Sequence, residues 1–394
     1  MAELYKLENE IKKYAWGSPD MIPHLMGKTN PKRESWAELW MGIHPGGPSK
    51  TTIQGKTVLL SEITTLPFLF KFLAAESPLS IQAHPNTAQA KEGFERENKA
   101  EIPLSAAERN YRDPNHKPEI ICALSPFTAM AGFREKAETA ELLSKVNGTE
   151  NLRSALKEGY LSFLSALFGL SETERKILNE SVLKAADREM SAMDDPSHDK
   201  ESLPVFFCGK LARLYPNDPG ILSPLYLNVI NLKPFQALFL PAGILHAYIH
   251  GLAMECMANS DNVLRGGLTP KHIDLKELFS ILNFDPFIPE LLDPVRTASP
   301  GCYSFAQACR EFSLYLIQNP VSFDDPALPE GIELQLEQPE MGIFAVYNGT
   351  AEIFIKGKTI VLNSGESAFI SRRNKGENIH FSGNFTLFAA LAPE

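Results

Sequence analysis

The distribution of proline is the feature that most restricts how this chain can fold. The 394 residues include 29 prolines, but none lies between Pro126 and Pro196, where an even spread would place about five. Proline removes a backbone donor and breaks helices, so its absence over such a length is typical of a helical region. The proline gap therefore predicts a helical block within a chain that has prolines throughout its other parts.

Helix signals inside the gap support this prediction. The segment 171–174 (Ser-Glu-Thr-Glu) is a capping box, in which the first serine and the last glutamate cap each other's backbone donors. Gly148, Gly159 and Gly169 are candidate ends of shorter helices. We expect a helical subdomain over residues 131–218. Apolar residues at helical spacing behind the capping box are Leu178, Val182, Ala185, Ala186, Met190 and Met193.

Both flanks of the helical block have the pattern of β-strands. Residues 78–85, 111–124 and 221–251 are rich in leucine, isoleucine, phenylalanine and turn residues. In the tail, Asn348-Gly349 between two apolar runs predicts a hairpin with a type I′ turn, and turns are expected at 356–358 and 364–366. Short strands with regular turns favour an antiparallel barrel or jelly roll. The expected fold is mainly β, with two β units and the helical insertion in the first.

Composition excludes several classes of protein. The formal charge of −10 disfavours a nucleic-acid binder, whose affinity depends on neutralising phosphates. No apolar stretch approaches the ~20 residues that cross a bilayer, and the N-terminus has no signal-peptide pattern. The five cysteines are widely spaced, without a Cys-x-x-Cys pair, and most have apolar neighbours. We expect a cytoplasmic protein with no nucleic-acid or membrane partner.

Three segments place polar residues on one face of a strand. In 78–85 the period of two puts Ser80, Gln82 and His84 on one side and only apolar residues on the other. Lys117 and Glu119 share a face where a buried run begins. In the third segment, His246, Tyr248 and His250 alternate with apolar residues. Each segment alone also fits an ordinary surface strand, a salt bridge or a structural histidine.

Together these segments offer a set of metal ligands. Gln82, His84, Glu119 and His246 would supply two imidazoles, a carboxylate and an amide oxygen. This set suits Zn²⁺, and equally Mn²⁺, Fe²⁺ or Co²⁺, because spacing does not choose the metal. The separations in sequence are large, so the pattern alone supports the site weakly.

Several motifs occur in order along residues 14–271. They are 14–17 (Tyr-Ala-Trp-Gly), 34–40 (Glu-Ser-Trp-Ala-Glu-Leu-Trp), 82–85 (Gln-Ala-His-Pro), 117–119 (Lys-Pro-Glu), 246–248 (His-Ala-Tyr), 255–265 (Glu-Cys-Met-Ala-Asn-Ser-Asp-Asn-Val-Leu-Arg) and 267–271 (Gly-Leu-Thr-Pro-Lys). These motifs resemble those of the type I mannose-6-phosphate isomerases, and the C-terminal part carries no such motif. Gly266-Gly267 and Gly243-Ile244-Leu245 depart from the family pattern, but they alter loop stiffness more than chemistry.

The resemblance implies a zinc enzyme of the cupin class that interconverts mannose 6-phosphate and fructose 6-phosphate. It implies one Zn²⁺ per chain, held by Gln82, His84, Glu119 and His246. Two cupin-type barrels are then expected, the catalytic one formed by 1–130 and 219–292 and the second by 293–394. We expect a monomer whose partner is a small sugar phosphate. Residues that the resemblance places along the active site are Arg265, Glu255, Asp261, Lys117 and Tyr248.

The reaction moves a proton between two carbons through an enediol, so it needs a base and a positive charge near the developing oxyanion. Arg265 or the metal can supply the charge. The base is open among Lys117, Glu255, Asp261 and a partly engaged His84. Glu255 is as readily interpreted as a structural partner of Arg265.

The phosphate of the substrate needs cations or hydroxyl groups away from the reacting carbons. Ser80, Lys71 and Lys271 are candidates, although Lys71 fits a solvated surface charge slightly better. Trp16 is a candidate wall of the sugar cavity, whereas Trp36 and Trp40 are expected in the core.

Two other classes remain open at this point. A non-catalytic sugar-binding cupin would have the same β units, but it gives no reason for Lys117, Glu255 and Arg265 to accompany four metal ligands. An Fe²⁺ oxygenase of the cupin type fits a glutamine ligand less well. Metal content and a test of O₂ consumption distinguish these possibilities.

Overall fold

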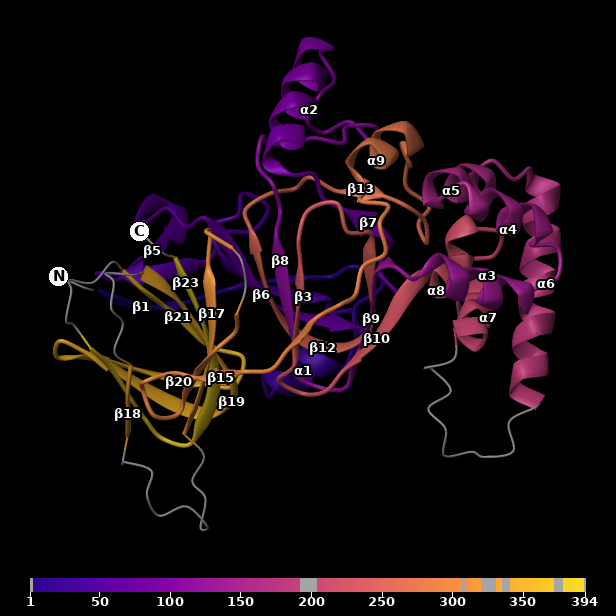
Figure 1. Cartoon of the computed structure of the whole chain (residues 1–394). Helices are drawn as coiled ribbons and strands as arrows, with labels where there is room; N and C mark the ends of the chain where they lie inside the picture. The colour runs from indigo at the N-terminus through magenta and orange to yellow at the C-terminus, as the bar shows by residue number, and fades with distance from the viewer. Residues whose placement is uncertain are drawn as a thin grey trace.

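The computed structural model describes residues 3–191, 204–306, 309–319, 331–334, 341–371 and 378–392. In these ranges the protein is mainly β, with a helical region on one side, as the sequence predicts (Figure 1). Met193 lies outside the described residues. No helix in the described ranges is long and apolar enough to cross a membrane.

The first large sheet has eleven strands in the described part of the chain and holds the polar segments. Its path runs β14-β11-β8-β12-β6-β3-β2, and β10, β9, β7 and β13 branch from it. The strands are β2 (Glu10–Lys12), β3 (Glu38–Gly42), β6 (Phe68–Ala75), β7 (Gln82–Ala83), β8 (Glu119–Ala123), β9 (Phe127–Phe133), β10 (Leu227–Leu232), β11 (Ala237–Leu240), β12 (His246–Ala258), β13 (Leu264–Arg265) and β14 (Leu291–Leu292).

Strand β12 connects the two halves of this sheet. Its first residues pair with β9 and β7, and its residues from Gly251 onward pair with β6 and β8. Gly251 has φ +124°, and a Cβ there would lie 2.7 Å from the carbonyl oxygen of Pro126. Glycine therefore permits the change of direction that carries β12 from one half to the other.

The second large sheet has ten strands in the described ranges, with the path β1-β21-β19-β23-β17-β16-β15. Its first strand, β1, comes from the N-terminus and pairs with β21. The assignment of residues 1–130 to the first unit is therefore wrong for β1. The strands are β1 (Leu4–Leu7), β15 (Val295–Arg296), β16 (Cys302–Ser304), β17 (Ser313–Asn319), β18 (Gly331–Leu334), β19 (Met341–Ile355), β20 (Lys358–Asn363), β21 (Ser367–Ile370), β22 (Ile379–Ser382) and β23 (Phe385–Ala392).

The hairpin predicted at Asn348-Gly349 is wrong, because β19 runs without a turn from Met341 to Ile355. The pair instead lies at a bulge, where the register with β23 shifts between Val346 and Asn348. The type I′ geometry occurs at Lys356-Gly357, with φ of +49° and +77°. That turn joins β19 to β20, and the Gly365 turn is also present as expected.

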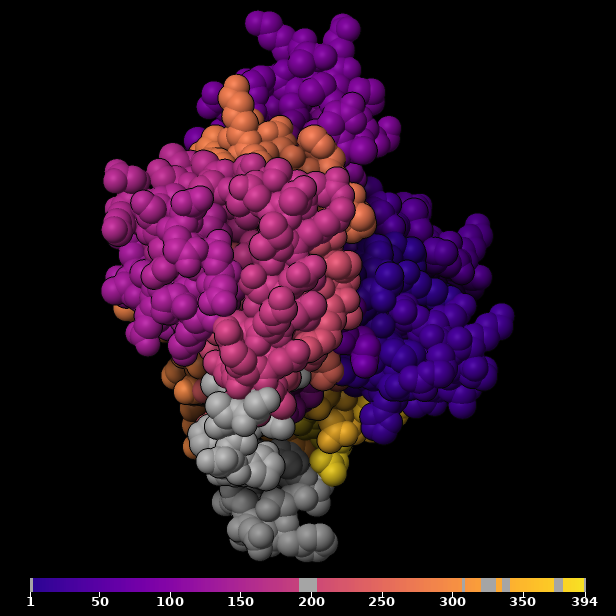
Figure 2. All heavy atoms as spheres, turned by 90° about the vertical axis from the view of Figure 1, so that its right-hand side faces the viewer, coloured from indigo at the N-terminus to yellow at the C-terminus, as the bar shows by residue number. Residues whose placement is uncertain are grey.

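The helices between residues 136 and 226 lie on a different side of the first sheet from the second sheet (Figures 1 and 2). The capping box at Ser171 and Glu174 is confirmed, and it begins the longest helix. A separate two-stranded sheet, formed by β4 (Lys50–Ile53) and β5 (Lys56–Leu59), contacts β1 through β4. The helices are α1 (Met21–Leu25), α2 (Thr87–Lys99), α3 (Lys136–Ser144), α4 (Glu150–Lys157), α5 (Tyr160–Phe168), α6 (Glu172–Ser191), α7 (Pro204–Leu214), α8 (Ser223–Tyr226) and α9 (Leu275–Ile281).

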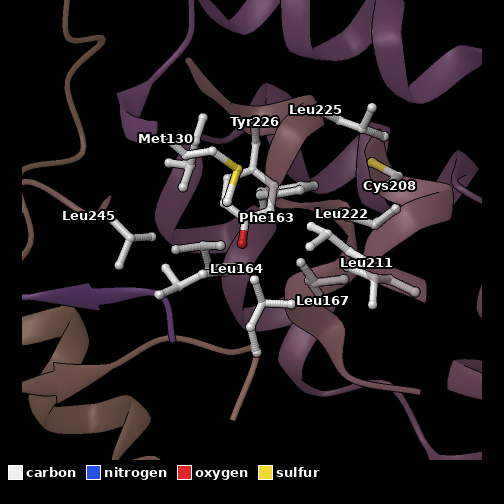
Figure 3. Close-up of a cluster of buried hydrophobic side chains, with 14 of the residues drawn as sticks. Met130, Phe163, Leu164, Leu167, Cys208, Leu211, Leu222, Leu225, Tyr226 and Leu245 are labelled. Carbon is white, nitrogen blue, oxygen red and sulfur yellow. The ribbon is translucent and has the colours of Figure 1, made fainter. Parts of the chain in front are cut away.

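An apolar core joins the helices to the back of the strands that carry the polar segments. Figure 3 shows Phe163 and Leu164 of α5 and Leu211 of α7 packed near Met130 of β9. Leu245, next to His246, belongs to the same core. The helical region thus supports β9 and the start of β12 from the outer side of the first sheet.

The two sheets share a second core. Alternate residues of β6, such as Phe70 and Phe72, pack with Leu314 and Phe388 of the second sheet. The intervening residues of β6, including Lys71, face the inside of the first sheet, where they line a cavity. Even this fully buried strand therefore has one apolar face and one face that reaches the site.

Candidate metal centre and cavity

Three ligand-type side chains meet inside the first sheet. One donor atom from each of His84, Glu119 and His246 lies within 4.8 Å of the others. His84 Nε2 is 3.3 Å from Glu119 Oε1, and His246 Nε2 is 3.4 Å from Glu119 Oε2. All three side chains are at most 2% exposed.

Strand pairing explains why residues so distant in sequence meet. Gln82 of the short strand β7 lies opposite His246 of β12 on one side and opposite Arg265 of β13 on the other. Glu119 begins β8, which pairs with the second half of β12. Only Gln82–Ala83 of the expected strand at 78–85 is a strand, but this pair suffices to place Gln82 and His84.

Both imidazoles are oriented by backbone carbonyls. His84 Nδ1 lies 2.7 Å from Asn262 O, and His246 Nδ1 lies 2.9 Å from Ile244 O. A carbonyl only accepts, so each Nδ1 carries the proton and each Nε2 keeps its lone pair. Both Nε2 atoms are buried and make no hydrogen bond with the described residues.

The electrostatics keep the cluster in its metal-binding protonation state. Burial, followed by the charge of Lys117, lowers the pKa of His84 to about 4, so the ring is neutral at pH 7. Burial opposes ionisation of Glu119, but the charge of Lys117 outweighs it and holds the pKa of this carboxyl group well below the usual range. Two imidazoles with free Nε2 atoms and a carboxylate fit a divalent zinc ion, and Gln82, which pairs with His246, adjoins them as a candidate fourth ligand.

A cavity of about 710 Å³ opens beside this cluster, and Glu119 borders both. Tyr14 and Glu38 also line it, and the sequence had not marked either as a site residue. The site residues expected from the sequence that line the cavity are Trp16, Lys71, Ser80, Gln82, Lys117, Glu119, Tyr248, Glu255, Arg265 and Lys271.

Lys71 lies between two carboxylates. Its Nζ is 2.5 Å from Glu255 Oε2 and 3.0 Å from Glu38 Oε1, and its side chain is 8% exposed. Burial favours the neutral amine, but Glu255 and Glu38 outweigh it and raise the pKa of Lys71. Lys71 is therefore not a solvated surface charge, and its charge is already compensated without a phosphate. Glu255 pairs with Lys71 rather than with Arg265.

A bulge in β12 places Glu255 on the cavity side. His246 and Tyr248 are an odd number of residues away from Glu255 along the strand. In a regular strand, Glu255 would therefore lie on the face opposite to His246 and Tyr248. The register with β9 shifts between Tyr248 and His250, which inserts one extra residue. Tyr248 and Glu255 consequently share the cavity, whereas His250 does not line it.

Glu119 also receives two polar groups from the cavity. Lys117 Nζ is 3.0 Å from Glu119 Oε1, and the Tyr248 hydroxyl donates to Glu119 Oε2 over 3.2 Å. Burial and the neighbouring carboxylates raise the pKa of Tyr248 well above its usual range, so it remains a donor.

Two cations of the cavity have no carboxylate partner. Arg265 and Lys271 line the cavity, and no carboxylate among the described residues forms an ion pair with either. Burial, then the charge of Arg112, lowers the pKa of Arg265; burial, Arg265 and Arg112 lower that of Lys271. Three mutually repelling cations favour an anionic ligand. Arg112 carries no motif that would have distinguished it in the sequence.

Asp261 lies apart from these groups. Its side chain is 50% exposed and does not line the cavity, and its Oδ1 is 3.3 Å from His44 Nε2. The hydrogen bond with His44 lowers the pKa of Asp261. The expectation that Asp261 belongs to the catalytic group is not supported by this placement. Trp40 and Trp36 pack in or against the cores, as expected.

Comparison with known proteins agrees with this geometry. A family model described as the catalytic domain of phosphomannose isomerase type I matches residues 4–136. The chain is 39% identical to mannose-6-phosphate isomerase of Salmonella typhimurium, covering 96% of this chain and 98% of the relative. It is 38% identical to that of Escherichia coli, covering 93% and 95%.

Solved structures are also similar. A zinc-bound crystal structure of mannose 6-phosphate isomerase has a TM-score of 0.84 and 34% identity, and covers 99% of this chain and 100% of that one. A variant of phosphomannose isomerase from Salmonella typhimurium reaches 0.86 with the same identity and coverage. The chain belongs to the family of type I phosphomannose isomerases.

Proposed function

We propose that this protein interconverts D-mannose 6-phosphate and D-fructose 6-phosphate, using one zinc ion per chain. The observation that carries the proposal is a single cavity that combines a metal-ligand cluster with uncompensated cations. Glu119 of the buried cluster, whose two imidazoles have free Nε2 atoms, lines this cavity together with Arg265 and Lys271. A sugar phosphate needs both features, because a metal can act at its reacting carbons and a cation can bind its phosphate.

In this proposal Gln82, His84, Glu119 and His246 hold the metal. When bound, zinc supplies positive charge that stabilises the oxygens on the reacting carbons. The carbonyls behind the two imidazoles fix their orientation. Tyr248 orients Glu119 through its hydroxyl, and Lys117 balances the charge of that carboxylate.

We assign the proton transfer between C1 and C2 to Glu255. Burial raises the pKa of this carboxyl group, which makes its carboxylate a stronger base than an exposed one. Lys71, held between Glu255 and Glu38, keeps its proton and compensates the charge of the site. Asp261 faces His44 outside the cavity, and His84 has its Nδ1 engaged, so both are poorly placed for this step.

Arg265 and the phosphate-binding residues complete the assignment. Arg265 ends strand β13, where it pairs with Gln82, and its guanidinium stabilises the enediolate oxygen as negative charge develops. Lys271 and Ser80, which line the same cavity, bind the phosphate, and Trp16 forms a wall for the sugar. Lys71 is left out of the phosphate group because two carboxylates engage it.

The finer organisation is also part of this proposal. We assign residues 8–130 and 219–292 to a catalytic cupin-type barrel, 131–218 to a helical insertion, and 293–394 with β1 to a second cupin-like unit. The separate apolar clusters of the first and second sheets and the pairing of β1 with β21 support this division. The free cysteines support a reducing, cytoplasmic location, and we expect a monomer.

The direct test is conversion of mannose 6-phosphate labelled with ¹³C at C2, followed by NMR with zinc-loaded protein. We expect fructose 6-phosphate to appear, and a single deuterium to enter the sugar in D₂O. A protein that binds the sugar without converting it would indicate a binding module. O₂ consumption with iron, but no isomerisation with zinc, would indicate an oxygenase.

A further inference from the structure

Asn262 is a fully buried residue in the loop between β12 and β13. Its side-chain amide spans a second loop, residues 112–115. Asn262 Nδ2 donates to Asp113 O over 2.8 Å and to Asn115 O over 2.9 Å, and Oδ1 accepts from the backbone N–H of Arg112 over 2.7 Å. The amide therefore uses both of its protons and its oxygen on the main chain of one short segment.

The main chain of Asn262 contacts a different part of the site. Its carbonyl oxygen is the acceptor, at 2.7 Å, for His84 Nδ1. That contact leaves the lone pair of His84 on Nε2, facing Glu119. Strand β13, with Arg265, begins two residues after Asn262.

The segment that Asn262 fixes leads directly into the site. Residues 112–115 are followed by Lys117 and Glu119, both of which border the cavity. Buried backbone groups need partners, and a loop without regular secondary structure must obtain them from side chains. Because one buried amide supplies three of these partners, a change in its position moves both loops together.

We propose that Asn262 is a positioning residue that holds His84, the Lys117–Glu119 segment and Arg265 in one register. It touches neither the cavity nor the ligand atoms, so its effect passes through the groups that it orients. No other side chain of this size offers two donors and one acceptor: aspartate would place an anion against two carbonyl oxygens, and leucine would leave all three groups unpaired. The inference rests on the proposed metal centre, but not on which sugar the protein isomerises.

The test compares Asn262→Asp and Asn262→Ala with Asn30→Ala. Asn30 makes the same three kinds of bond: Nδ2 donates to Pro19 O and Glu34 O, both at 2.8 Å, and Oδ1 accepts from Glu34 N at 3.1 Å. It lies in an N-terminal loop outside the residues that line the cavity. This control therefore reports the general cost of losing such an amide.

Zinc affinity is measured by competition with a chromophoric chelator at a temperature where each variant is folded. Both Asn262 variants keep the carbonyl behind His84 but release the loop that positions it. Loss of a partner behind a metal ligand typically weakens binding about 10- to 100-fold, and we expect displacement of this carbonyl to weaken zinc binding in the same range. We expect the Asn30 variant to stay within twofold of the parent. Kinetics at saturating zinc should show a fall in kcat larger than the change in KM for the Asn262 variants alone.

A second readout uses the metal-free protein. With ¹⁵N-labelled histidine, NMR of the parent should show His84 protonated at Nδ1, and the Asn262 variants should show a mixture of tautomers. If Asn262→Ala does not fold, Asn262→Asp carries the comparison, because it preserves the volume. Zinc affinity within twofold of the parent in a folded Asn262 variant would overturn the inference. Failure of the parent to isomerise the sugar, with zinc affinity still dependent on Asn262, would instead refute only the proposed function.

Discussion

His116 Nε2 lies 2.6 Å from Glu311 Oε1, which joins the segment before Lys117 to the segment before strand β17. Glu311 Oε2 also accepts from the thiol of Cys309. The carboxylate thus links the loop that enters the first sheet to the chain that enters the second. The contact is partly exposed, with side chains 32% and 24% accessible.

We expect Glu311→Gln to reduce the free energy of unfolding by at most about 1 kcal/mol at pH 7, because solvent weakens such a pair. Burial opposes ionisation of Glu311, but the contacts with His116 and Cys309 outweigh it and lower its pKa from 4.5. Because folding lowers the pKa of Glu311, these contacts stabilise the folded protein at pH values above the unfolded-state pKa. The stabilisation is lost as the pH falls through the folded-state pKa. Denaturant unfolding of parent and variant should therefore differ at pH 7 and converge below pH 4.5. A difference that persists at lower pH would contradict the assignment.

Removal of zinc tests the metal centre. Elemental analysis of protein purified without added metal should find close to one equivalent per chain, and a chelator should lower the melting temperature. Binding to the folded state alone contributes about 2.7 kcal/mol when zinc is at 100 times its Kd. His84→Ala and His246→Ala should lose the metal. The control variant His380→Ala, whose side chain is half exposed on strand β22, should keep it. Full retention of zinc in both site variants would refute the ligand assignment.

For Arg265→Ala we expect kcat to fall by ~10²-fold or more, about 3 kcal/mol, as for removal of an oxyanion donor. KM should change much less and zinc content should stay the same, because the guanidinium acts mainly in the transition state. Arg265→Lys, which keeps the charge but loses the planar fork, should recover part of the activity. A kcat within threefold of the parent, measured with the melting temperature on the same preparation, would end the catalytic interpretation.

Glu255→Gln tests the base. The amide keeps the volume but cannot accept the proton, so we expect kcat to fall by at least the ~10²-fold typical of general bases. Exchange of the C2 proton with D₂O should fall in parallel, with zinc content unchanged. Glu38→Gln removes the other carboxylate beside Lys71 and serves as the matched control. Loss of activity in Glu255→Gln with normal proton exchange would show that another group is the general base, and Lys117 would be the next candidate to test.

The helical region should shape the site without supplying reacting groups. Lys176 is 58% exposed on α6, and we expect Lys176→Ala to alter activity less than tenfold. Leu164 is fully buried in the core of Figure 3, and Leu164→Ala should cost about 2–5 kcal/mol of stability. Unfolding curves and kcat per folded molecule separate these effects. A thousandfold loss in a folded Lys176 variant would contradict this division of roles.

Patterns of local period and punctuation could be predicted from the sequence. The proline gap, the glycine helix ends and the capping box at Ser171 each depend on residues close in sequence, and all three are present. The alternation in residues 78–85 likewise predicted that Ser80 and Gln82 would line one cavity. Bringing the three segments together required the resemblance to a known family, because no local pattern determines which strands pair.

The errors share a physical cause. The Asn348-Gly349 signal was overridden by pairing of β19 with four other strands, which favours a continuous strand with a bulge. The bulge in β12 that turns Glu255 inward depends on the register with β9. The environment of Lys71 depends on two carboxylates from separate strands, β3 and β12. Long-range pairing, rather than local preference, decided each case.

The pairing of β1 with β21 has a consequence for how the protein is made. Strand β1 leaves the ribosome more than 350 residues before its partner, as in the register of Leu4 with Ile370. Until β21 has been synthesised, β1 lacks this partner, and unpaired strand edges are prone to association with other chains. Closure of this long loop makes late, non-local folding slow. Chaperone capture of nascent chains should therefore persist until β21 emerges, and chains truncated before Ser367 should aggregate through their N-terminal end.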